Sequence, residues 1–284
     1  MKSILYVTDL YYKAKGRNYY EEDLYITSCF KDHFNVLICH PHQVLEFLDV
    51  ADMIIIRNSG SIIYYKEYYE KFVEEARYRN VTVFNSLDGK GDMQGKQYLL
   101  ELTQLGFPVI PTIEHTDDLD ISILGEATRY IVKPKFGADS IGMKVLAKDA
   151  LHNQDLQGML VQPFISFNYE LSFYFLNNQF EYALYAPNKS KRWELEEFIP
   201  NETDLDFARK FVQWNNMECG IQRVDACRLP NGNLLLVELE DLNPFLSLDK
   251  LSESNKVQFV ENFITAIAQH DQILTTEENE SIDQ

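Results

Sequence analysis

The chain has few basic residues for its length. Its 284 residues include 26 lysines and arginines against 44 aspartates and glutamates, which gives a formal net charge of −18. A surface this acidic repels nucleic-acid backbones and anionic membranes, so we expect neither as a partner. If such a protein binds a phosphate ligand, it must gather its few cations in one place.

Cysteine and long apolar runs are also scarce. The four cysteines (Cys29, Cys39, Cys219 and Cys227) form neither a CxxC pair nor a disulfide framework, which indicates reduced thiols. No run approaches the ~20 apolar residues of a membrane span, and a predicted strand begins at Ile4 without a preceding signal peptide. We therefore expect a cytoplasmic protein.

Core-forming residues, by contrast, are plentiful. Hydrophobic residues make up 45% of the chain, with 17 tyrosines and 18 phenylalanines, which excludes global disorder. The length predicts about two domains at roughly 150 residues each. No internal repeat and no low-complexity segment interrupts the sequence.

The first part of the chain has an α/β pattern. Apolar runs of strand length lie at residues 4–7, 36–39, 53–56 and 81–84, and charged, tyrosine-rich stretches such as 64–78 lie between them. This alternation predicts parallel strands joined by crossover helices. A helix is then expected over about 95–105, ended by Gly106 and Pro108.

The remainder predicts mainly antiparallel strands. We expect strands at 130–132, 143–146 and 159–162, and a hairpin of 171–176 with 180–185. A capping box at Thr203 and Asp206 predicts a helix to about Asn216. A second hairpin over 222–239 follows, and then a helix over 255–270 whose apolar stripe holds Val257, Val260, Ile264 and Ile267. The predicted division is 1–84, 85–165, 166–270 and an acidic tail at 271–284, which we expect to be frayed from Thr275.

The second hairpin brings acidic residues together. Asn231-Gly232 predicts a two-residue type I′ turn, which pairs Asp225 with Glu238 and Arg223 with Glu240. Strand alternation puts these four side chains on one face. The opposite face is apolar and should be buried, with Val224, Ala226, Val237 and Leu239.

Directly opposed acids on one face repel each other. A divalent cation held by carboxylate oxygens would relieve the conflict between Asp225 and Glu238, and Mg²⁺ commonly uses one or two carboxylates plus substrate phosphates. The alternative is that both acids face water at the sheet surface and are partly neutralised by Arg223.

Lysines lie where a phosphate could bind. Lys133 ends the predicted strand, and the small-residue loop 136–142, which includes Ser140, follows it. Its ammonium group and the loop's backbone amides could hold a phosphate, although the Walker pattern is absent. The alternative is a hairpin connection with a solvated lysine, and Lys96 in the preceding helix has the same two interpretations.

A further set of residues could read a nucleotide. Gln162 and the residues after Pro163 could contact an adenine edge, and Glu170 could accept from ribose hydroxyls. An ordinary strand end is the alternative. Lys189, Lys191 and Arg192 form a cationic cluster that could bind an anion or be an ordinary loop.

Taken in order, these motifs resemble the ATP-grasp superfamily. Segments 95–100 with 106–112, 130–142, 161–165 with Glu170, and 222–225 with 237–240 and 243–244 match its motifs in sequence order. The nearest branch is the group of glutathione synthetase, D-alanine–D-alanine ligase and the D-cycloserine-forming ligase. The resemblance implies a Rossmann-like α/β pre-ATP-grasp domain over 1–84, followed by two α+β lobes that enclose the nucleotide.

The same resemblance implies an ADP-forming ligase that joins a carboxylate to an amine through an acyl phosphate. It assigns Mg²⁺, or Mn²⁺, to Asp225, Glu238 and Glu240, and catalytic roles to Arg223 and Lys189. The implied ATP ligands are Lys96, Lys133, Ser140, Gln162, Phe164, Ile165 and Glu170. Two positions depart from the family pattern: Glu240 replaces the usual asparagine, and Tyr169 replaces the glycine usual before Glu170.

The substrate is the least specified part. The ends of the N-terminal strands offer Arg57 and Asn58, with Thr8, Asp9 and Ser59 nearby, and Lys191 is a further candidate. The expected partners are ATP, a small carboxylate, an amine and a second copy of the chain in a homodimer. The alternatives are an ATP-grasp kinase, a protein-modifying amino-acid ligase and an ATP-binding protein that has lost its activity.

Overall fold

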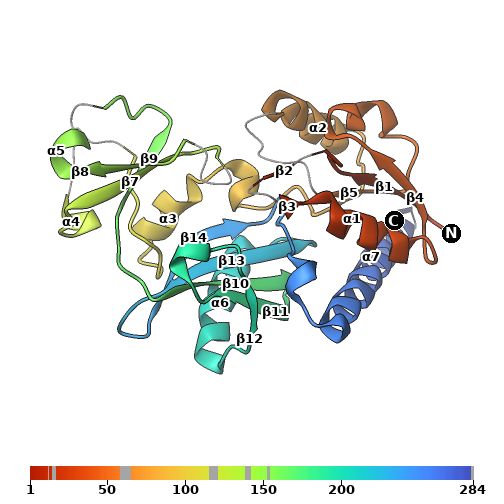
Figure 1. Ribbon diagram of the computed structural model, residues 1–284. Coiled ribbons are helices and arrows are strands. Elements are labelled where there is room, and N and C mark those ends of the chain that lie inside the picture. Colours follow the sequence, from red (N-terminus) through yellow and green to blue (C-terminus); the bar gives the residue numbers. More distant parts are fainter. Residues whose placement is uncertain are drawn as a thin grey trace.

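The computed structural model describes residues 1–11, 13–14, 17–57, 65–114, 121–137, 142–151 and 154–282. Their strands form a four-stranded, a three-stranded and a five-stranded sheet, with a two-stranded ribbon of β2 (Lys13–Ala14) and β3 (Arg17–Asn18). Figure 1 shows the three larger sheets in separate parts of the molecule. Among the described residues, no helix has both the length and the hydropathy that a membrane span requires.

The N-terminal sheet is parallel, in the order β4-β1-β5-β6. Its central strands are almost wholly apolar and are buried on both faces, as covered parallel strands are. The predicted strands and crossover connections are therefore confirmed. The bounds are β1 (Ser3–Val7), β4 (Asn35–Cys39), β5 (Met53–Ile56) and β6 (Val83–Phe84), with α1 (Tyr20–Phe30), the 3₁₀ helix η1 (Pro41–Phe47) and α2 (Lys66–Tyr78) between them.

The two faces of this sheet are covered differently. Ile4 and Tyr6 of β1 pack with residues of α1 and the C-terminal helix, whereas Leu5 and Val7 pack with residues of η1 and α2. The C-terminal helix, α7 (Glu253–Ile282), also covers one face of the five-stranded sheet through Phe259 and Phe263. It therefore joins the first and last parts of the chain in one core.

A linker, residues 85–97, leads from β6 into α3 (Tyr98–Gln104) and includes the 3₁₀ helix η3 (Asp92–Gln94). The predicted helix was expected to begin near Gly95, but Gly95 has a φ of +90° and α3 begins three residues later. Lys96 therefore lies in a turn before the helix rather than inside it. The helix is followed by Gly106 at φ +72°, as predicted.

A central lobe of three antiparallel strands, in the order β8-β7-β9, follows the linker and α3. It consists of α4 (Ile121–Leu124), β7 (Arg129–Pro134), β8 (Lys144–Ala147), α5 (Lys148–Leu151) and β9 (Met159–Pro163). The three predicted strands are confirmed. Residues 138–141 of the predicted phosphate loop, including Ser140, lie outside the described residues.

The five-stranded sheet is antiparallel, in the order β12-β11-β10-β13-β14. One face packs on α3 and α6, and the other packs on α7. Both predicted hairpins are present. The bounds are β10 (Tyr169–Leu176), β11 (Gln179–Ala186), β12 (Glu196–Phe198), α6 (Glu202–Asn215), β13 (Ile221–Arg228) and β14 (Leu234–Glu240), with the 3₁₀ helices η4 (Lys189–Lys191) and η5 (Leu248–Lys250).

Three details of the predicted helices are wrong. The cap of α6 is Asn201, whose side chain accepts from the Asp204 backbone N–H, and not a Thr203 capping box. Helix α7 does not end near His270, because its backbone stays helical to Ile282, where a frayed tail was expected. Val257, expected on its buried stripe, is 40% exposed, and Phe259 and Phe263 face the core instead.

Candidate active site

The β13–β14 hairpin places the predicted acids as expected. Arg223 lies opposite Glu240, and Asp225 lies opposite Glu238. The turn itself differs from the prediction. Leu229 and Asn233 are hydrogen-bonded to each other, Gly232 donates back to Leu229, and Gly232 has a φ of +90°. The loop therefore has three residues and ends in a left-handed glycine, where a two-residue type I′ turn was predicted.

A β-bulge compensates for the longer turn. The register shifts between Asp225 and Ala226, which leaves Val237 as an extra residue on β14. The additional residue in the loop shifts the register by one position, and the bulge shifts it back. The two pairs beyond the bulge, Asp225 with Glu238 and Arg223 with Glu240, are therefore the predicted ones. The predicted burial of Val237 is wrong: Leu236 faces the core, fully buried, and Val237 lines a cavity.

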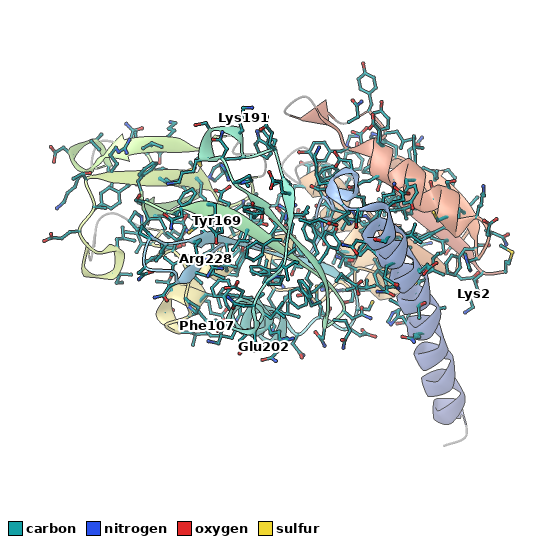
Figure 2. All side chains as sticks on the ribbon, turned by 60° about the horizontal axis from the view of Figure 1, so that its bottom comes forward. Lys2, Phe107, Tyr169, Lys191, Glu202 and Arg228 are labelled. Carbon is teal, nitrogen blue, oxygen red and sulfur yellow. The ribbon has the colours of Figure 1, made fainter. Side chains whose placement is uncertain are left out.

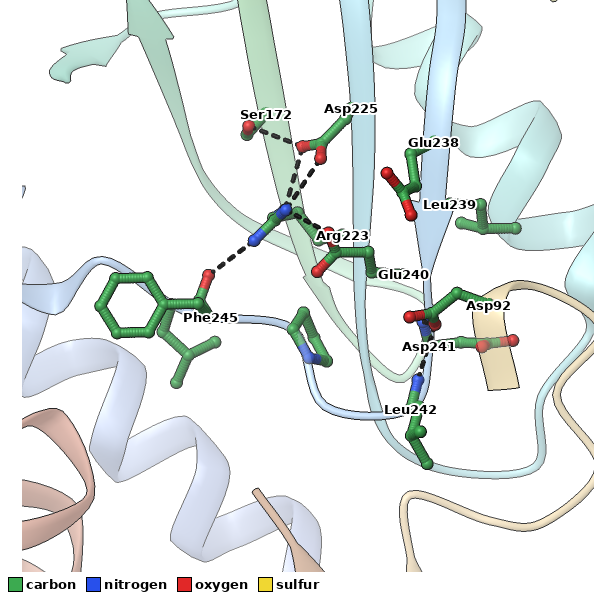
Figure 3. Close-up of polar contacts among 12 residues, drawn as sticks. Asp92, Ser172, Arg223, Asp225, Glu238, Leu239, Glu240, Asp241, Leu242 and Phe245 are labelled. Carbon is green, nitrogen blue, oxygen red and sulfur yellow. Dashed lines mark hydrogen bonds and ion pairs between the residues drawn. The ribbon is translucent and has the colours of Figure 1, made fainter. Parts of the chain in front are cut away.

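Arg223 lies at the centre of the acidic face (Figure 3). Its Nε and Nη2 donate to the two oxygens of Asp225 at 3.0 and 2.8 Å, and Nη2 also donates to Glu240. Burial opposes its charge, but Asp225 and Glu240 outweigh burial and raise the pKa of Arg223. Arg223 thus neutralises the opposed acids, and Ser172 adds a hydrogen bond of 2.7 Å to Asp225.

Glu238 has a different counter-ion. The Lys96 ammonium donates to it, and Lys96 is only 7% exposed. Burial opposes ionisation of Glu238, but Lys96 and then Lys133 outweigh it, so its pKa is lowered. Burial, with a smaller effect of Lys96, lowers the pKa of Lys133 to about 7. Two lysines from distant segments therefore act on one carboxylate.

The carboxylate oxygens of Asp225, Glu238 and Glu240 suit a hard cation, although these side chains are not arranged around one. Among the described residues, no group of three or more histidine, cysteine, aspartate or glutamate side chains has a metal-binding arrangement. Arg223 and Lys96 serve as the counter-ions instead. Burial and then Asp225 raise the pKa of Glu240 to about 8 even beside Arg223. Carboxylate oxygens are the ligands that Mg²⁺ prefers.

A cavity of about 670 Å³ opens beside this cluster. That volume lies within the roughly 300–1,000 Å³ range of small-molecule sites. The central lobe and the five-stranded sheet both contribute to its walls. The predicted residues that line it are Lys96, Lys133, Gln162, Phe164, Ile165, Glu170, Lys189 and Glu238.

The fold was compared with known proteins. No protein-family model matches the sequence, and no curated protein sequence matches it. Among solved structures, D-cycloserine synthetase DcsG is similar over 93% of this chain and 99% of its own, at 18% identity and a TM-score of 0.70. D-alanine–D-alanine ligase from Bacillus anthracis, complexed with ATP, is similar over 98% and 100%, at 13% identity and a TM-score of 0.67.

A third neighbour is the macrocyclase MdnC bound with its precursor peptide MdnA, from Microcystis aeruginosa MRC. It is similar over 90% of this chain and 97% of its own, at 13% identity and a TM-score of 0.63. Another is described as the ATP-grasp ligase PsnB, at a TM-score of 0.62. The chain has the ATP-grasp fold. This confirms the fold predicted from the ordered motifs.

One predicted substrate residue, Lys191, does not line the cavity. Lys191 pairs with Glu194 at 2.6 Å, has more than half of its side chain exposed, and lies at the outer edge of the molecule in Figure 2. Its neighbour Arg192 lines the cavity instead and donates to Glu170 at 2.6 Å. Asn58 lies outside the described residues.

Arg57, a further residue predicted to contact the substrate, is buried. It is 1% exposed, and Nη2 donates to the Pro244 carbonyl at 2.9 Å and to Glu22 at 3.3 Å. Asp23, which accepts from Tyr6 and Thr8, lies 3.9 Å from its Nε. In the described structure Arg57 therefore ties the N-terminal sheet to the segment after β14.

The sequence analysis does not identify a carboxyl pair, Asp92 and Asp241, that fixes the end of β14 in the candidate site. Asp92 accepts from the backbone N–H groups of Asp241 and Leu242 at 2.7 and 3.1 Å, and Asp241 accepts from those of Gly91 and Met93 at 2.7 and 2.8 Å. Figure 3 shows Asp92 beside the end of β14. The sequence signals are Gly89 and Gly91, because a β-carbon at either position would lie 2.9 Å from the Asp241 carboxyl carbon.

Proposed function

We propose that this protein is an ATP-dependent ligase that joins a carboxylate to an amine and releases ADP and phosphate. One observation carries the proposal: Lys96, Lys133 and Glu238 line one cavity beside the Arg223 cluster. Cations and acids beside a nucleotide-sized space are the groups that phosphoryl transfer requires. The ligases among the structural neighbours support the same reaction class.

The cavity residues divide by chemistry. Lys96 and Lys133 would bind the phosphates, together with Ser140 of the β7–β8 loop. Gln162, Phe164 and Ile165 would contact the base, and Glu170 would accept from the ribose. Lys189, whose ammonium lies 5.3 Å from the centre of the Phe167 ring, supplies a further cation at the cavity wall.

Asp225, Glu238 and Glu240 would hold Mg²⁺ or Mn²⁺, which when bound neutralises phosphate charge. In its absence Lys96 and Arg223 neutralise these acids. Binding of the nucleotide would therefore redirect the Lys96 ammonium from Glu238 toward phosphate oxygens. Arg223 keeps Asp225 and Glu240 at fixed positions and stabilises negative charge that develops during transfer.

The reaction has two steps. A carboxylate oxygen of the first substrate attacks the γ-phosphorus of ATP, the bond to the β–γ bridging oxygen breaks, and ADP leaves. The amine of the second substrate then attacks the acyl carbon, inorganic phosphate leaves, and the nitrogen loses one proton. Exclusion of water from the cavity protects the acyl phosphate between the two steps.

The proposal is tested by screening amino acids and small carboxylates, with and without amines, for ADP release with Mg²⁺. A ligase releases ADP in proportion to the amide formed. A kinase would release ADP without an amine and phosphorylate a hydroxyl, and absence of turnover with every pair would contradict the ligase. Asp225→Asn should abolish turnover without altering the circular dichroism spectrum.

A peptide carboxylate is a second candidate acceptor. The neighbour MdnC was solved with a precursor peptide and PsnB with a minimal precursor, and the similarity to this chain covers 97% and 99% of those two proteins. The charge of −18 disfavours an acidic peptide, because it would be repelled. The screen therefore includes neutral and acidic peptides, and ADP release with a peptide but not with small carboxylates would favour peptide ligation over small-molecule ligation.

A further inference from the structure

Residues 109–113 link the two walls of the cavity. Val109 forms a bridge with Leu236 of β14, and Ile113 forms one with Val161 of β9. Between these bridges lies Thr112, which is 3% exposed, and Gln162 beside it is 2% exposed and lines the cavity. The Thr112 backbone N–H donates to the Thr103 hydroxyl at 3.1 Å. Contacts with β14, β9 and α3 therefore fix the position of this segment.

A hydrogen-bond chain in this segment has a fixed direction. The Thr112 hydroxyl donates its single proton to the Ile110 carbonyl at 2.9 Å. A carbonyl oxygen can only accept, so the hydroxyl has only lone pairs left to offer. The donor to these lone pairs is Gln162 Nε2, which lies 2.8 Å from Thr112 Oγ1 and 3.4 Å from the Ile110 carbonyl oxygen.

The direction of the chain orients the glutamine amide. If the amide were reversed, its oxygen would face the Ile110 carbonyl, which can only accept, and the Thr112 hydroxyl could donate to that oxygen only by giving up its bond to the carbonyl. With the nitrogen held on that side, the amide oxygen is the group that Gln162 can turn toward the cavity. Thr112, which does not line the cavity, thereby decides whether Gln162 offers an acceptor or a donor there.

We propose that Thr112 is a positioning residue that makes Gln162 a hydrogen-bond acceptor for the nucleotide base. An acceptor pairs with the exocyclic amino group of adenine and repels the 6-oxo group of inosine or guanosine nucleotides. The inference rests on the proposed function, since it assigns this wall of the cavity to the base. A site built around one polar group discriminates strongly against a ligand that leaves it unpaired.

The test compares the affinities of ATP, ITP and purine riboside triphosphate, which has no substituent at position 6, in titrations with Mg²⁺. The wild-type protein should bind ATP most tightly, then the unsubstituted nucleotide, then ITP. Thr112→Val, which is close in volume but cannot accept, should reduce the ATP-to-ITP preference by about tenfold, with ITP binding gained as well as ATP binding lost. Thr112→Ser should keep the wild-type preference.

Other outcomes overturn the inference in different ways. An unchanged ATP-to-ITP ratio in Thr112→Val would show that Thr112 has only a structural role, because a packing defect weakens all three nucleotides alike. If the valine variant does not fold, Gln162→Met must lose the ATP preference, and a retained preference overturns the inference. A folded wild-type protein that binds none of the nucleotides contradicts the proposed function together with it.

Discussion

Arg57 and Arg223 donate to the carbonyl groups of consecutive residues, Pro244 at 2.9 Å and Phe245 at 3.0 Å. The first arginine follows β5 of the parallel sheet, and the second lies on β13 of the hairpin. The next residue, Leu246, donates to Glu22 at 3.0 Å and accepts from the Tyr182 hydroxyl at 2.8 Å. The strap, residues 244–246, therefore couples the N-terminal sheet to the acidic face of the candidate site.

The strap depends on a buried cation, so Arg57→Met should be strongly destabilising. It would remove a hydrogen-bond partner of Glu22 and a counter-charge of Asp23, both of them buried, a loss of about 3–5 kcal/mol for broken buried pairs. Urea denaturation measures the change. Arg209→Met is the matched control, because Arg209 also contacts two carboxylates, Glu202 and Asp206, but at the surface, and should cost at most about 1 kcal/mol. Equal effects of the two variants would refute the buried network.

Glu22 should make the stability of the protein depend on pH. Burial, opposed by Arg57 and reinforced by Asp23, raises the pKa of Glu22 from 4.5 to about 8. The folded state then holds the proton more tightly than the unfolded state. The resulting stabilisation is complete below pH 4.5 and is lost as the pH rises to about 8, at up to about 1.4 kcal/mol per pH unit.

Glu22→Gln removes this titration. The wild-type free energy of unfolding, relative to that of the variant, should therefore decline steadily from pH 5 to pH 8 in parallel denaturation series. A difference that stays constant over this range, or rises, would contradict the raised pKa.

Lys133 and Lys135 provide a paired test of the nucleotide site. Lys133 lines the cavity, whereas Lys135, two residues on, donates to Glu114. Lys133→Ala should weaken ATP binding at least tenfold, since a hydrogen bond to a charged group contributes about 1.5–3 kcal/mol. Lys135→Ala should change the dissociation constant by less than about threefold. Calorimetric titration of both variants with ATP measures the two dissociation constants. Similar losses of ATP affinity in the two variants would exclude a specific role for Lys133.

Because the three-residue hairpin loop ends in a left-handed Gly232, a substitution at this position should destabilise the protein. At a φ of +90° an alanine is strained even though its β-carbon would meet no atom within 4 Å. Gly232→Ala should therefore lower the free energy of unfolding by roughly 1 kcal/mol. ATP affinity should not change, because the loop lies beyond the bulge at Val237. Thermal unfolding and one nucleotide titration check both parts, and an undiminished stability would mean that the turn has been misassigned.

The parts of the fold that the sequence predicts well depend on local patterns. Apolar runs located β1 and β5, and Asn231-Gly232 located the hairpin, because hydropathy and turn preference act over a few residues. Local patterns did not predict the bulge at Val237. Asn231-Gly232 indicates a two-residue turn, whereas the loop has three residues, and the bulge compensates for the additional one. The correct pairing of Asp225 with Glu238 thus came from two deviations that cancel.

The site depends more on contacts between distant segments. The ordered motifs identified Lys96, Lys133 and Glu238, but not that Lys96 would lie in a turn and pair with Glu238, 142 residues away. Arg57 was a candidate substrate residue because no local pattern shows that it is buried and donates to the Pro244 carbonyl, 187 residues on. Thr112 ends one of the matched segments, 106–112, but its proposed role follows only from the direction of its hydrogen bonds.

The proposed function requires that the cavity activate a carboxylate with the γ-phosphate of ATP. Hydroxylamine reveals this step, because it captures an acyl phosphate as a hydroxamate without the natural amine. With ATP, Mg²⁺ and the carboxylate that the screen identifies, we predict one hydroxamate for each ADP, and none with Asp225→Asn. Release of AMP and pyrophosphate, or of ADP without hydroxamate from a carboxylate substrate, would contradict it.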